Sequence, residues 1–221
     1  MSLDKSRRNN IRNNKKISLE FVPNRPERSF YFSVGDEISL FGNMEYEEKY
    51  AFCVWIDIYK NQDVERGPKV ARIVARMFDA FGIADIGDDI VDIADMISGD
   101  TELCVNRLVN WDVYKEAEND CGFWRAYVCY LEELYVYPKY RRKGIGRYLL
   151  SKLPELLEYS FNLEIRAIVC YLSPRNMTCE EMPPAEEEEM LQIMRKLYLS
   201  NRFVPLDPAQ RTLALINEDL E

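Results

Sequence analysis

The chain has 221 residues, with 29 Lys and Arg against 38 Asp and Glu, a formal net charge of -9, and 47% hydrophobic residues. This apolar share is far above that of a disordered chain, so we expect one globular domain or at most two small ones. The sequence contains no histidine, which excludes His-dependent catalytic triads, imidazole bases and His-ligated zinc. Acid–base chemistry therefore has to use Asp, Glu, Tyr, Lys or Cys.

The six cysteines form no Cys-x-x-Cys pair and are too sparse for a disulfide scaffold, so we expect reduced thiols in small core positions. No apolar run approaches the roughly 18 residues of a membrane span, and the first residues lack the apolar run of a signal peptide. We expect a soluble, cytoplasmic protein without a membrane partner. The cysteines stand at positions 53, 104, 121, 129, 170 and 179.

The first 16 residues carry six basic side chains against the single acidic Asp4. We interpret residues 1–16 as a basic, flexible arm and residues 17–221 as one domain. Because that domain is strongly acidic, nucleic acid is not expected as the main partner.

The first half of the chain predicts three strands and two helices. The strands cover residues 17–22, 29–34 and 50–60, and the last is rich in aromatic and branched residues. From Pro68 onward apolar residues recur at helical spacing up to Gly82, which predicts an amphipathic helix over about residues 70–81. A second helix is expected over residues 88–108, weakened in its middle by residues 98–100.

The second half predicts a long apolar strand over residues 123–137, a Gly-containing basic loop, and a helix over about residues 145–159 that contains Pro154. A strand over 165–172, a helix over 186–200 and two final strands over 203–206 and 212–216 follow. No repeat or long linker divides the chain. The order of elements predicts a mixed α/β (α+β) fold.

Two acidic clusters allow two interpretations. They are either solvated helix faces and helix N-termini, where carboxylates suit the helix dipole, or a field that attracts a cationic substrate. Neither has the spacing of a calcium loop, and we expect no metal site. The clusters consist of Asp85, Asp88, Asp89, Asp92, Asp95 and Asp100, and of Glu180, Glu181 and residues 186–189.

The loop between the long strand and the following helix carries the strongest chemical signal. Residues 139–147 contain five basic side chains, and glycines stand where the helix begins. Free backbone N–H groups at such a helix start can hold a phosphate or diphosphate. Two common nucleotide motifs fail, because Gly146 is not followed by Lys-Ser/Thr and Leu149 stands where a Rossmann fingerprint needs a small residue.

This segment resembles the acyl-CoA binding signature of the GNAT superfamily of N-acetyltransferases. That signature is a strand Leu-x-Val-x-Pro followed by x-x-Arg/Gln-x-x-Gly-x-Gly/Ala, and this chain matches it at Leu134, Val136, Pro138, Arg141, Gly144 and Gly146. The resemblance implies a central, mostly antiparallel, twisted sheet of about seven strands flanked by helices. It also implies that acetyl-CoA is the cosubstrate.

The resemblance further implies which residues hold acetyl-CoA. The pantetheine arm would pair with the strand around Leu134, Tyr135 and Val136, where the sheet opens. The loop would wrap the diphosphate with backbone N–H groups, and Lys139, Arg142, Lys143 or Arg147 would meet the 3′-phosphate. The loop residues are Arg141, Arg142, Lys143, Gly144, Ile145, Gly146 and Arg147.

Glu132 and Glu133 are the only carboxylates in the long strand. Acetyl transfer needs a neutral amine, and an alkylammonium has a pKa near ~10.4, so a base must take its proton. The string from Leu131 to Val136 is similar to one in polyamine and related small-amine acetyltransferases, which implies Glu132 as base and Glu133 as amine contact. In a regular strand only one of them faces the substrate, and a bulge near Tyr135 would change which one.

Tyr198 corresponds, by the same resemblance, to the tyrosine that protonates the departing CoA thiolate. The family pattern Tyr-x-x-x-Gly-Phe is matched by residues 198–203, except that Arg202 replaces Gly. We expect Asn201 to take the left-handed conformation instead. A nucleophilic role for Cys129 or Cys121 is not favoured, because no base is identifiable beside either thiol.

The sequence therefore predicts an N-acetyltransferase that moves an acetyl group from acetyl-CoA to a primary amine of a small molecule or peptide by direct attack. The alternative is a non-catalytic GNAT-fold module that binds acyl-CoA as a sensor or scaffold. The resemblance also allows a homodimer, because strand or helix exchange through the C-terminus is common among family members.

Overall fold

The structure, a computed structural model, describes residues 28–34, 38–48, 50–61, 66–111, 127–161, 164–174 and 183–216. The basic arm over residues 1–16, the predicted strand over 17–22, Cys121 and Cys179 lie outside the described residues.

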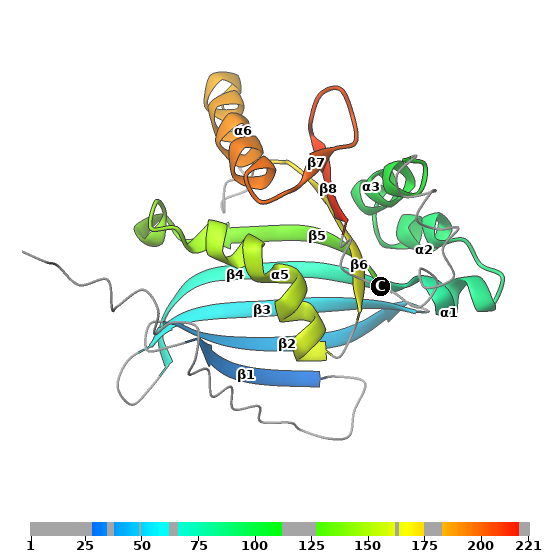
Figure 1. Ribbon diagram of the computed structural model, residues 1–221, viewed down its shortest axis with the longest axis horizontal. Helices are drawn as coiled ribbons and strands as arrows, with labels where there is room; N and C mark the ends of the chain where they lie inside the picture. Colours follow the sequence, from blue (N-terminus) through cyan, green and yellow to red (C-terminus); the bar gives the residue numbers. More distant parts are fainter. Residues whose placement is uncertain are drawn as a thin grey trace, which may run out of the picture.

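One sheet of eight strands, in the order β1-β2-β3-β4-β5-β6-β8-β7, runs through the molecule (Figure 1). Its strand pairs are antiparallel except for the parallel pair β5–β6. This confirms the mixed fold with a mostly antiparallel sheet flanked by helices. The strands are β1 (Arg28–Val34), β2 (Ile38–Glu48), β3 (Ala51–Asn61), β4 (Arg66–Asp79), β5 (Tyr127–Val136), β6 (Ile165–Tyr171), β7 (Val204–Pro205) and β8 (Thr212–Ile216).

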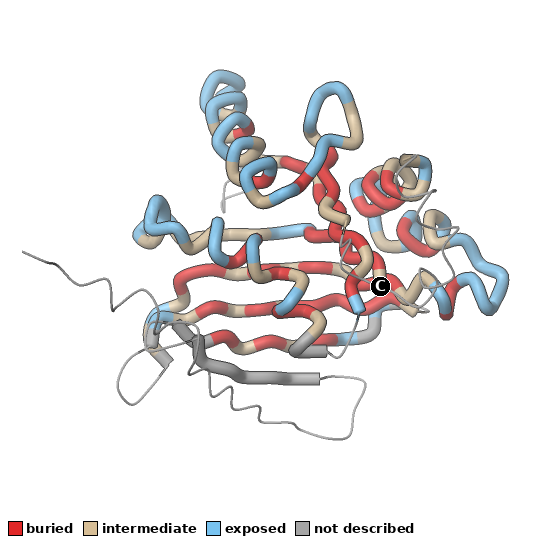
Figure 2. The backbone as a smooth tube through the Cα atoms, viewed as in Figure 1, coloured by how far each residue is buried: buried red, intermediate tan, exposed pale blue. Residues whose placement is uncertain are grey.

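The helices cover both faces of the sheet. One core contains α5 and α6 side chains packed on alternate residues of β2 to β5, and the other packs α1, α2 and α3 on β5, β6 and β8. Figure 2 shows that the buried positions concentrate in the central strands and on the inner sides of these helices. The helices are α1 (Ala80–Asp85), α2 (Ile90–Ile97), α3 (Gly99–Val109), α5 (Ile145–Phe161) and α6 (Pro184–Leu199).

The helix predicted over residues 70–81 is wrong. Residues 66–79 form β4, paired with β3 on one side and β5 on the other, and only the short α1 follows. Between residues 71 and 77 the buried positions are Ala71, Ile73, Ala75 and Met77, a period of two that belongs to a strand. Gly82 does not end a helix but lies inside α1, where an added Cβ would meet the ring of Tyr50 at 2.4 Å.

The other predicted elements that fall on described residues are confirmed. One predicted helix is divided into two, and one strand was not predicted. The long helix over 88–108 is divided at Ser98, whose side chain accepts a hydrogen bond from Thr101 N and caps α3. Strand β2 was missed by prediction, because its Gly42-Asn43 pair is typical of turns.

The acidic residues of the α2 and α3 region act largely as helix N-terminal groups. Asp89 caps α2 by accepting a hydrogen bond from Val91 N at 2.7 Å, and Asp92 lies in the first turn of α2. Asp100 lies in the first turn of α3, and Glu186 and Glu187 lie in the first turn of α6. Of the two interpretations, the helix-terminus one has direct structural support.

Candidate active site

The loop between β5 and α5 presents a cluster of free backbone donors. A 3-10 turn over Pro138–Tyr140 leads into it, and α5 begins at Ile145. Arg142 and Gly144 have positive φ values of 58° and 81°, which turn successive N–H groups toward one side. Among the described residues, no acceptor is found for the backbone N–H groups of residues 142–147.

Basic side chains surround these donors, but they are not equally free. Arg141 lies with its guanidinium carbon 5.3 Å from the centre of the Tyr135 ring, and its Nε donates to the Val136 carbonyl at 2.9 Å. The Nζ atoms of Lys139 and Lys143 lie over the ring of Tyr140. Arg142, on the loop, and Arg147, in the first turn of α5, are both exposed.

The sheet opens beside this loop, as the sequence predicted. β5 and β6 pair only over residues 127–130 of β5, and β5 then continues toward the loop while β6 turns away (Figure 1). Tyr137 N donates to Val70 O of β4 at 3.0 Å. The backbone N–H and C=O groups of successive strand residues point to alternate sides of the strand. Those of Tyr135 therefore also face β4, whereas those of Leu134 and Val136 face the open edge.

Helix α6 closes the other side of this opening. A Cβ added to Gly146 would lie 3.6 Å from Cδ2 of Leu197 on α6 and 3.7 Å from Cγ2 of Val136 on β5. The start of α5, the second half of α6 and the end of β5 therefore converge around one short stretch of backbone.

A bulge at Glu132 decides where the two glutamates point. Leu131 pairs with Ala75 and Glu133 pairs with Val74, so Glu132 is the extra residue of β5. The bulge therefore lies three residues before the Tyr135 position considered from sequence. In such a bulge the side chains of both residues, here Glu132 and Glu133, lie on the same face of the sheet as the single residue opposite them. That residue is Val74, which lies on the face away from α5. The expectation that only one glutamate faces this side is wrong.

Glu132 is held by an arginine. Arg76 of β4 forms an ion pair with Glu132 and also binds Glu47 of β2, with Nε–Oε2 at 2.9 Å and Nη2–Oε1 at 3.3 Å. The side chains of Arg76, Glu47 and Glu132 are 16%, 29% and 36% exposed. Prediction from sequence missed Arg76 because it assigned this residue to a helix, and it missed Glu47 because β2 was not recognised.

A second charged group lies on the same face, toward the loop. Asp57 of β3 accepts from Arg72 Nε at 3.1 Å and pairs with Lys69 Nζ at 2.6 Å. Burial raises the pKa of Asp57, but the two cations outweigh it and the pKa lies below its usual value. Arg72 also interacts with Glu133, so each glutamate of β5 has an arginine of β4 beside it.

Tyr198 lies on the other face of the sheet. Its side chain is 5% exposed, belongs to the core beneath α5, and meets Phe203 edge to face at 5.0 Å. Burial raises the pKa of Tyr198 well above its usual value, so this hydroxyl stays protonated at neutral pH. The structure therefore places Tyr198 and the two glutamates on opposite sides of β5.

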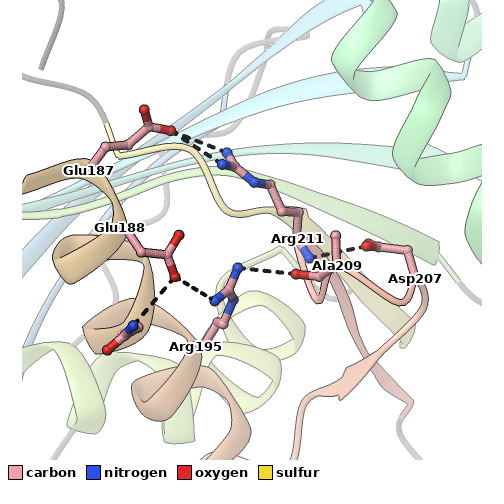
Figure 3. Close-up of polar contacts among 7 residues, drawn as sticks. Glu187, Glu188, Arg195, Asp207, Ala209 and Arg211 are labelled. Atoms are coloured by element: carbon pink, nitrogen blue, oxygen red, sulfur yellow. Dashed lines mark hydrogen bonds and ion pairs between the residues drawn. The ribbon is translucent and has the colours of Figure 1, made fainter. Parts of the chain in front are cut away.

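An ion pair and a hydrogen bond connect α6 to the hairpin between β7 and β8 (Figure 3). Glu187 pairs with Arg211 at 3.4 Å, and Arg195 joins Glu188 at 3.2 Å to the carbonyl of Ala209 at 3.1 Å. These contacts fix the helix that carries Tyr198.

Asp207 connects the same hairpin to α3. It accepts from Thr212 N at 2.6 Å and pairs with Arg107 of α3 at 3.2 Å. Burial raises the pKa of Asp207, but hydrogen bonds from Thr212 and Arg211 and the charge of Arg107 lower it overall. Sequence prediction recognised residues 207 and 208 only as a turn.

Arg202, not Asn201, takes the left-handed conformation at the end of α6, with φ 70°. Asn201 instead donates through Nδ2 to Leu197 O at 2.7 Å. The expectation about Asn201 is therefore wrong, although the turn that the family pattern describes is present.

The buried thiols do not support nucleophilic chemistry. Burial raises the pKa of Cys53 and of Cys104 to about 12, and it raises the pKa of Cys129 further. Within the described ranges, no group of His, Cys, Asp or Glu is arranged to hold a metal ion. In the same part of the chain, no helix is long and apolar enough to cross a membrane.

Residues 106–181 match the family model described as the acetyltransferase (GNAT) domain. This segment contains β5, the basic loop, α5 and β6. The acyl-CoA signature lies within it, from the end of β5 to the start of α5. Through this segment the chain is similar to the GNAT acetyltransferase domain. No curated protein matches it.

Several solved structures of N-acetyltransferases are similar to the chain at low identity. NAA60 of Arabidopsis thaliana, in complex with a bisubstrate analogue, is 11% identical with a TM-score of 0.39, covering 79% of this chain and 86% of that one. Arylalkylamine N-acetyltransferase 2 of Aedes aegypti is 10% identical with a TM-score of 0.38 and 72% coverage of each chain. The polyamine N-acetyltransferase of Drosophila melanogaster is 13% identical with a TM-score of 0.34, covering 75% and 74%.

Proposed function

We propose that this protein is an N-acetyltransferase that transfers the acetyl group of acetyl-CoA to a primary amine of a small molecule or peptide. The observation that carries the proposal is the group of free backbone N–H donors at residues 142–147, placed beside the open edge of β5. A strand edge and an anion-binding helix start, side by side, fit a ligand with an amide-containing arm and a diphosphate.

The chain would hold acetyl-CoA through backbone groups more than side chains. Leu134 and Val136 offer N–H and C=O groups to the pantetheine amides, and the Val136 carbonyl becomes free when the Arg141 side chain moves away. The basic side chains at positions 142, 143 and 147 are available for phosphate. When bound, acetyl-CoA supplies a thioester that an amine can attack.

Glu132 and Glu133 would prepare the amine. Because the bulge puts both on one face, Glu133 contacts the arriving ammonium while Glu132 takes its proton, directly or through a water molecule. The neutral amine then attacks the acetyl carbonyl directly, with no covalent acyl-enzyme. The raised pKa values of the described thiols agree with this route.

Tyr198 would protonate the departing thiolate. Its raised pKa keeps the hydroxyl in the donor form, and a thiol of pKa near ~8.5 is a fair leaving group, so the donor is helpful and not essential. Tyr198 and the two glutamates lie on opposite faces of the sheet, and the open edge of β5 is the border between these faces. A ligand at that edge can therefore meet the proposed base on one face and the proposed acid on the other.

The ion pair between Glu132 and Arg76 favours a second candidate function. A carboxylate engaged by a guanidinium is not free to take a proton, so the chain could bind acyl-CoA as a sensor or scaffold without catalysis. In that case the three proposed residues would be dispensable.

Substitutions at these residues test the proposal. With an accepted amine, we expect Glu132→Gln to lower kcat by about 10²- to 10⁴-fold, the usual contribution of a positioned base. Tyr198→Phe should lower kcat by a smaller factor, and both variants should bind acetyl-CoA as the wild type does. Glu155→Gln, on the exposed face of α5, is the matched control. Wild-type kcat in Glu132→Gln would refute the base assignment.

A further inference from the structure

Four side chains form a row across the face of the sheet that carries Glu132. Glu47 lies at the end of β2, Cys53 on β3, Arg76 on β4 and Glu132 on β5. We propose that Glu47 is a positioning residue: it keeps Arg76 in place, so that Glu132 can leave the ion pair and turn to an arriving amine. This inference rests on the proposed role of Glu132 as the base.

Glu47 holds Arg76 independently of Glu132. It binds Arg76 through two parallel hydrogen bonds at 2.9 and 3.3 Å, a bidentate geometry that fixes the plane of the guanidinium. Glu132 contacts Nη1, which Glu47 leaves free. Breaking the contact with Glu132 therefore leaves the geometry at Glu47 intact.

The burial of Arg76 makes this second partner necessary. Only 16% of the Arg76 side chain is exposed, and a guanidinium left without a counter-ion in that position is costly. With Glu47 present, Arg76 remains paired when Glu132 moves. Without Glu47, Glu132 becomes the principal counter-ion of Arg76 and is held more tightly.

The short side chain of Cys53 allows Glu47 to reach Arg76. Cys53 pairs with both Glu45 and Arg76 in the strand register, so Glu47 has to extend across β3 above it. A cysteine is short enough to leave that path open. Its thiol stays neutral, because burial and the nearby carboxylates raise its pKa to about 12, so it adds no charge to the row.

Other charged and titratable groups lie on the same face of the sheet as Glu132. On β2 these are Glu45 and Glu47, on β3 Cys53 and Asp57, on β4 Arg72 and Arg76, and on β5 Glu133 and Tyr130. Of the cations among them, Arg76 is the one in contact with Glu132. Removing Glu47 leaves the charge of Arg76 uncompensated, which favours the ionised form of Glu132. Removing Arg76 leaves neighbouring carboxylates that repel each other, which disfavours it.

The first test measures the pH dependence of kcat/KM for an accepted amine in the wild type, Glu47→Gln and Arg76→Gln. We expect Glu47→Gln to lower kcat/KM by about tenfold and to move the acid-side break to lower pH by about half a unit. Arg76→Gln should move the break to higher pH. Glu155→Gln, on the exposed face of α5, is the control and should keep the wild-type profile. An unmoved break in Glu47→Gln would overturn the proposal.

A second readout does not depend on activity. The titration of the Glu132 carboxyl carbon can be followed by NMR in the full chain labelled with ¹³C-glutamate and assigned by its loss in Glu132→Gln. A midpoint that falls in Glu47→Gln and rises in Arg76→Gln supports the role of Glu47, even if Glu132→Gln retains activity and the proposed base role fails. Equal midpoints in the wild type and Glu47→Gln would refute the positioning role, whatever the activity.

Discussion

Arg202 is a non-glycine residue in the left-handed region, at the turn that follows α6. This conformation costs about 1–2 kcal/mol for most L-residues, and glycine avoids that cost. We expect Arg202→Gly to raise the free energy of unfolding by about 1 kcal/mol, measured by urea denaturation. Arg202→Ala, which removes the same side chain but keeps the strain, should give no such gain. Equal stabilisation by both variants would show that the side chain, not φ, is responsible.

At the residue scale, the resemblance in sequence suggested roles for Glu132, Glu133 and Tyr198 but could not predict how their side chains are oriented. The alternation of a regular strand puts adjacent side chains on opposite faces, and the bulge at Glu132 cancels that rule. A bulge depends on pairing with Val74 and Ala75, more than fifty residues away in the chain. The contacts of Arg76 could not be predicted from sequence for the same reason, because they are set by non-local strand pairing.

Gly144 and Gly146 have different roles in the loop, and this can be tested. Gly144 has φ 81°, so an alanine there is strained although space is free. Gly146 has no unusual φ, and an added Cβ would make ordinary contacts. We expect Gly144→Ala to weaken acetyl-CoA binding by about tenfold, because strain of ~1–2 kcal/mol shifts the loop. Gly146→Ala should stay within about threefold, as measured by calorimetric titration. The opposite order would contradict a site built from this backbone conformation.

At the scale of elements, most helices and strands near the loop followed from local pattern, but β4 did not. Its residues Val70, Ile73, Val74 and Met77 fit a helical period as well as a strand, and Ala71 and Ala75 are too small to stand out in a hydrophobic pattern. Pairing with β3 and β5 makes this segment a strand and not a helix, and it buries the odd-numbered positions from 71 to 77. Short-range periodicity does not contain that information.

Asp207 joins α3 and the β7–β8 hairpin, and its lowered pKa makes this link depend on pH. A carboxyl whose folded-state pKa is lowered adds stability above its unfolded pKa, and that stability is lost as the pH falls through the folded value. We expect Asp207→Asn to lower the free energy of unfolding by about 2 kcal/mol at pH 7. The difference from the wild type should shrink as the pH falls below the ordinary value of 3.8.

Asp95→Asn, on the exposed side of α2, is the control for Asp207→Asn and should change stability little at either pH. Denaturation at pH 7 and at pH 3 checks both variants. A loss in Asp207→Asn that stays constant between the two pH values would show that packing, not the charge of Asp207, holds the hairpin.

At the scale of the whole molecule, helices cover both faces of one sheet, β5 and β6 separate beyond residue 130 of β5, and the basic loop, α5 and α6 converge on that opening. The general fold and the loop could be predicted because six signature residues and their strand–loop–helix context are contiguous in sequence. The face that carries Glu132 and Glu133, where we propose that the amine binds, could not be predicted, because it is assembled from β2, β3, β4 and β5. Helices α1, α2 and α3 cover one end of that face, where α1 and α3 contact β5.

The measurement that tests this account most directly is a single-turnover reaction of the full chain with acetyl-CoA and a panel of amines, read by mass spectrometry of the amines. The panel contains polyamines, aminoglycosides, free amino acids and lysine peptides, each paired with its tertiary-amine analogue. We predict an N-acetylated product from at least one class of primary amine, with equal release of free CoA, and no such product from the tertiary analogues. Saturating acetyl-CoA binding without any acetylated amine would contradict the enzyme assignment and support the non-catalytic alternative.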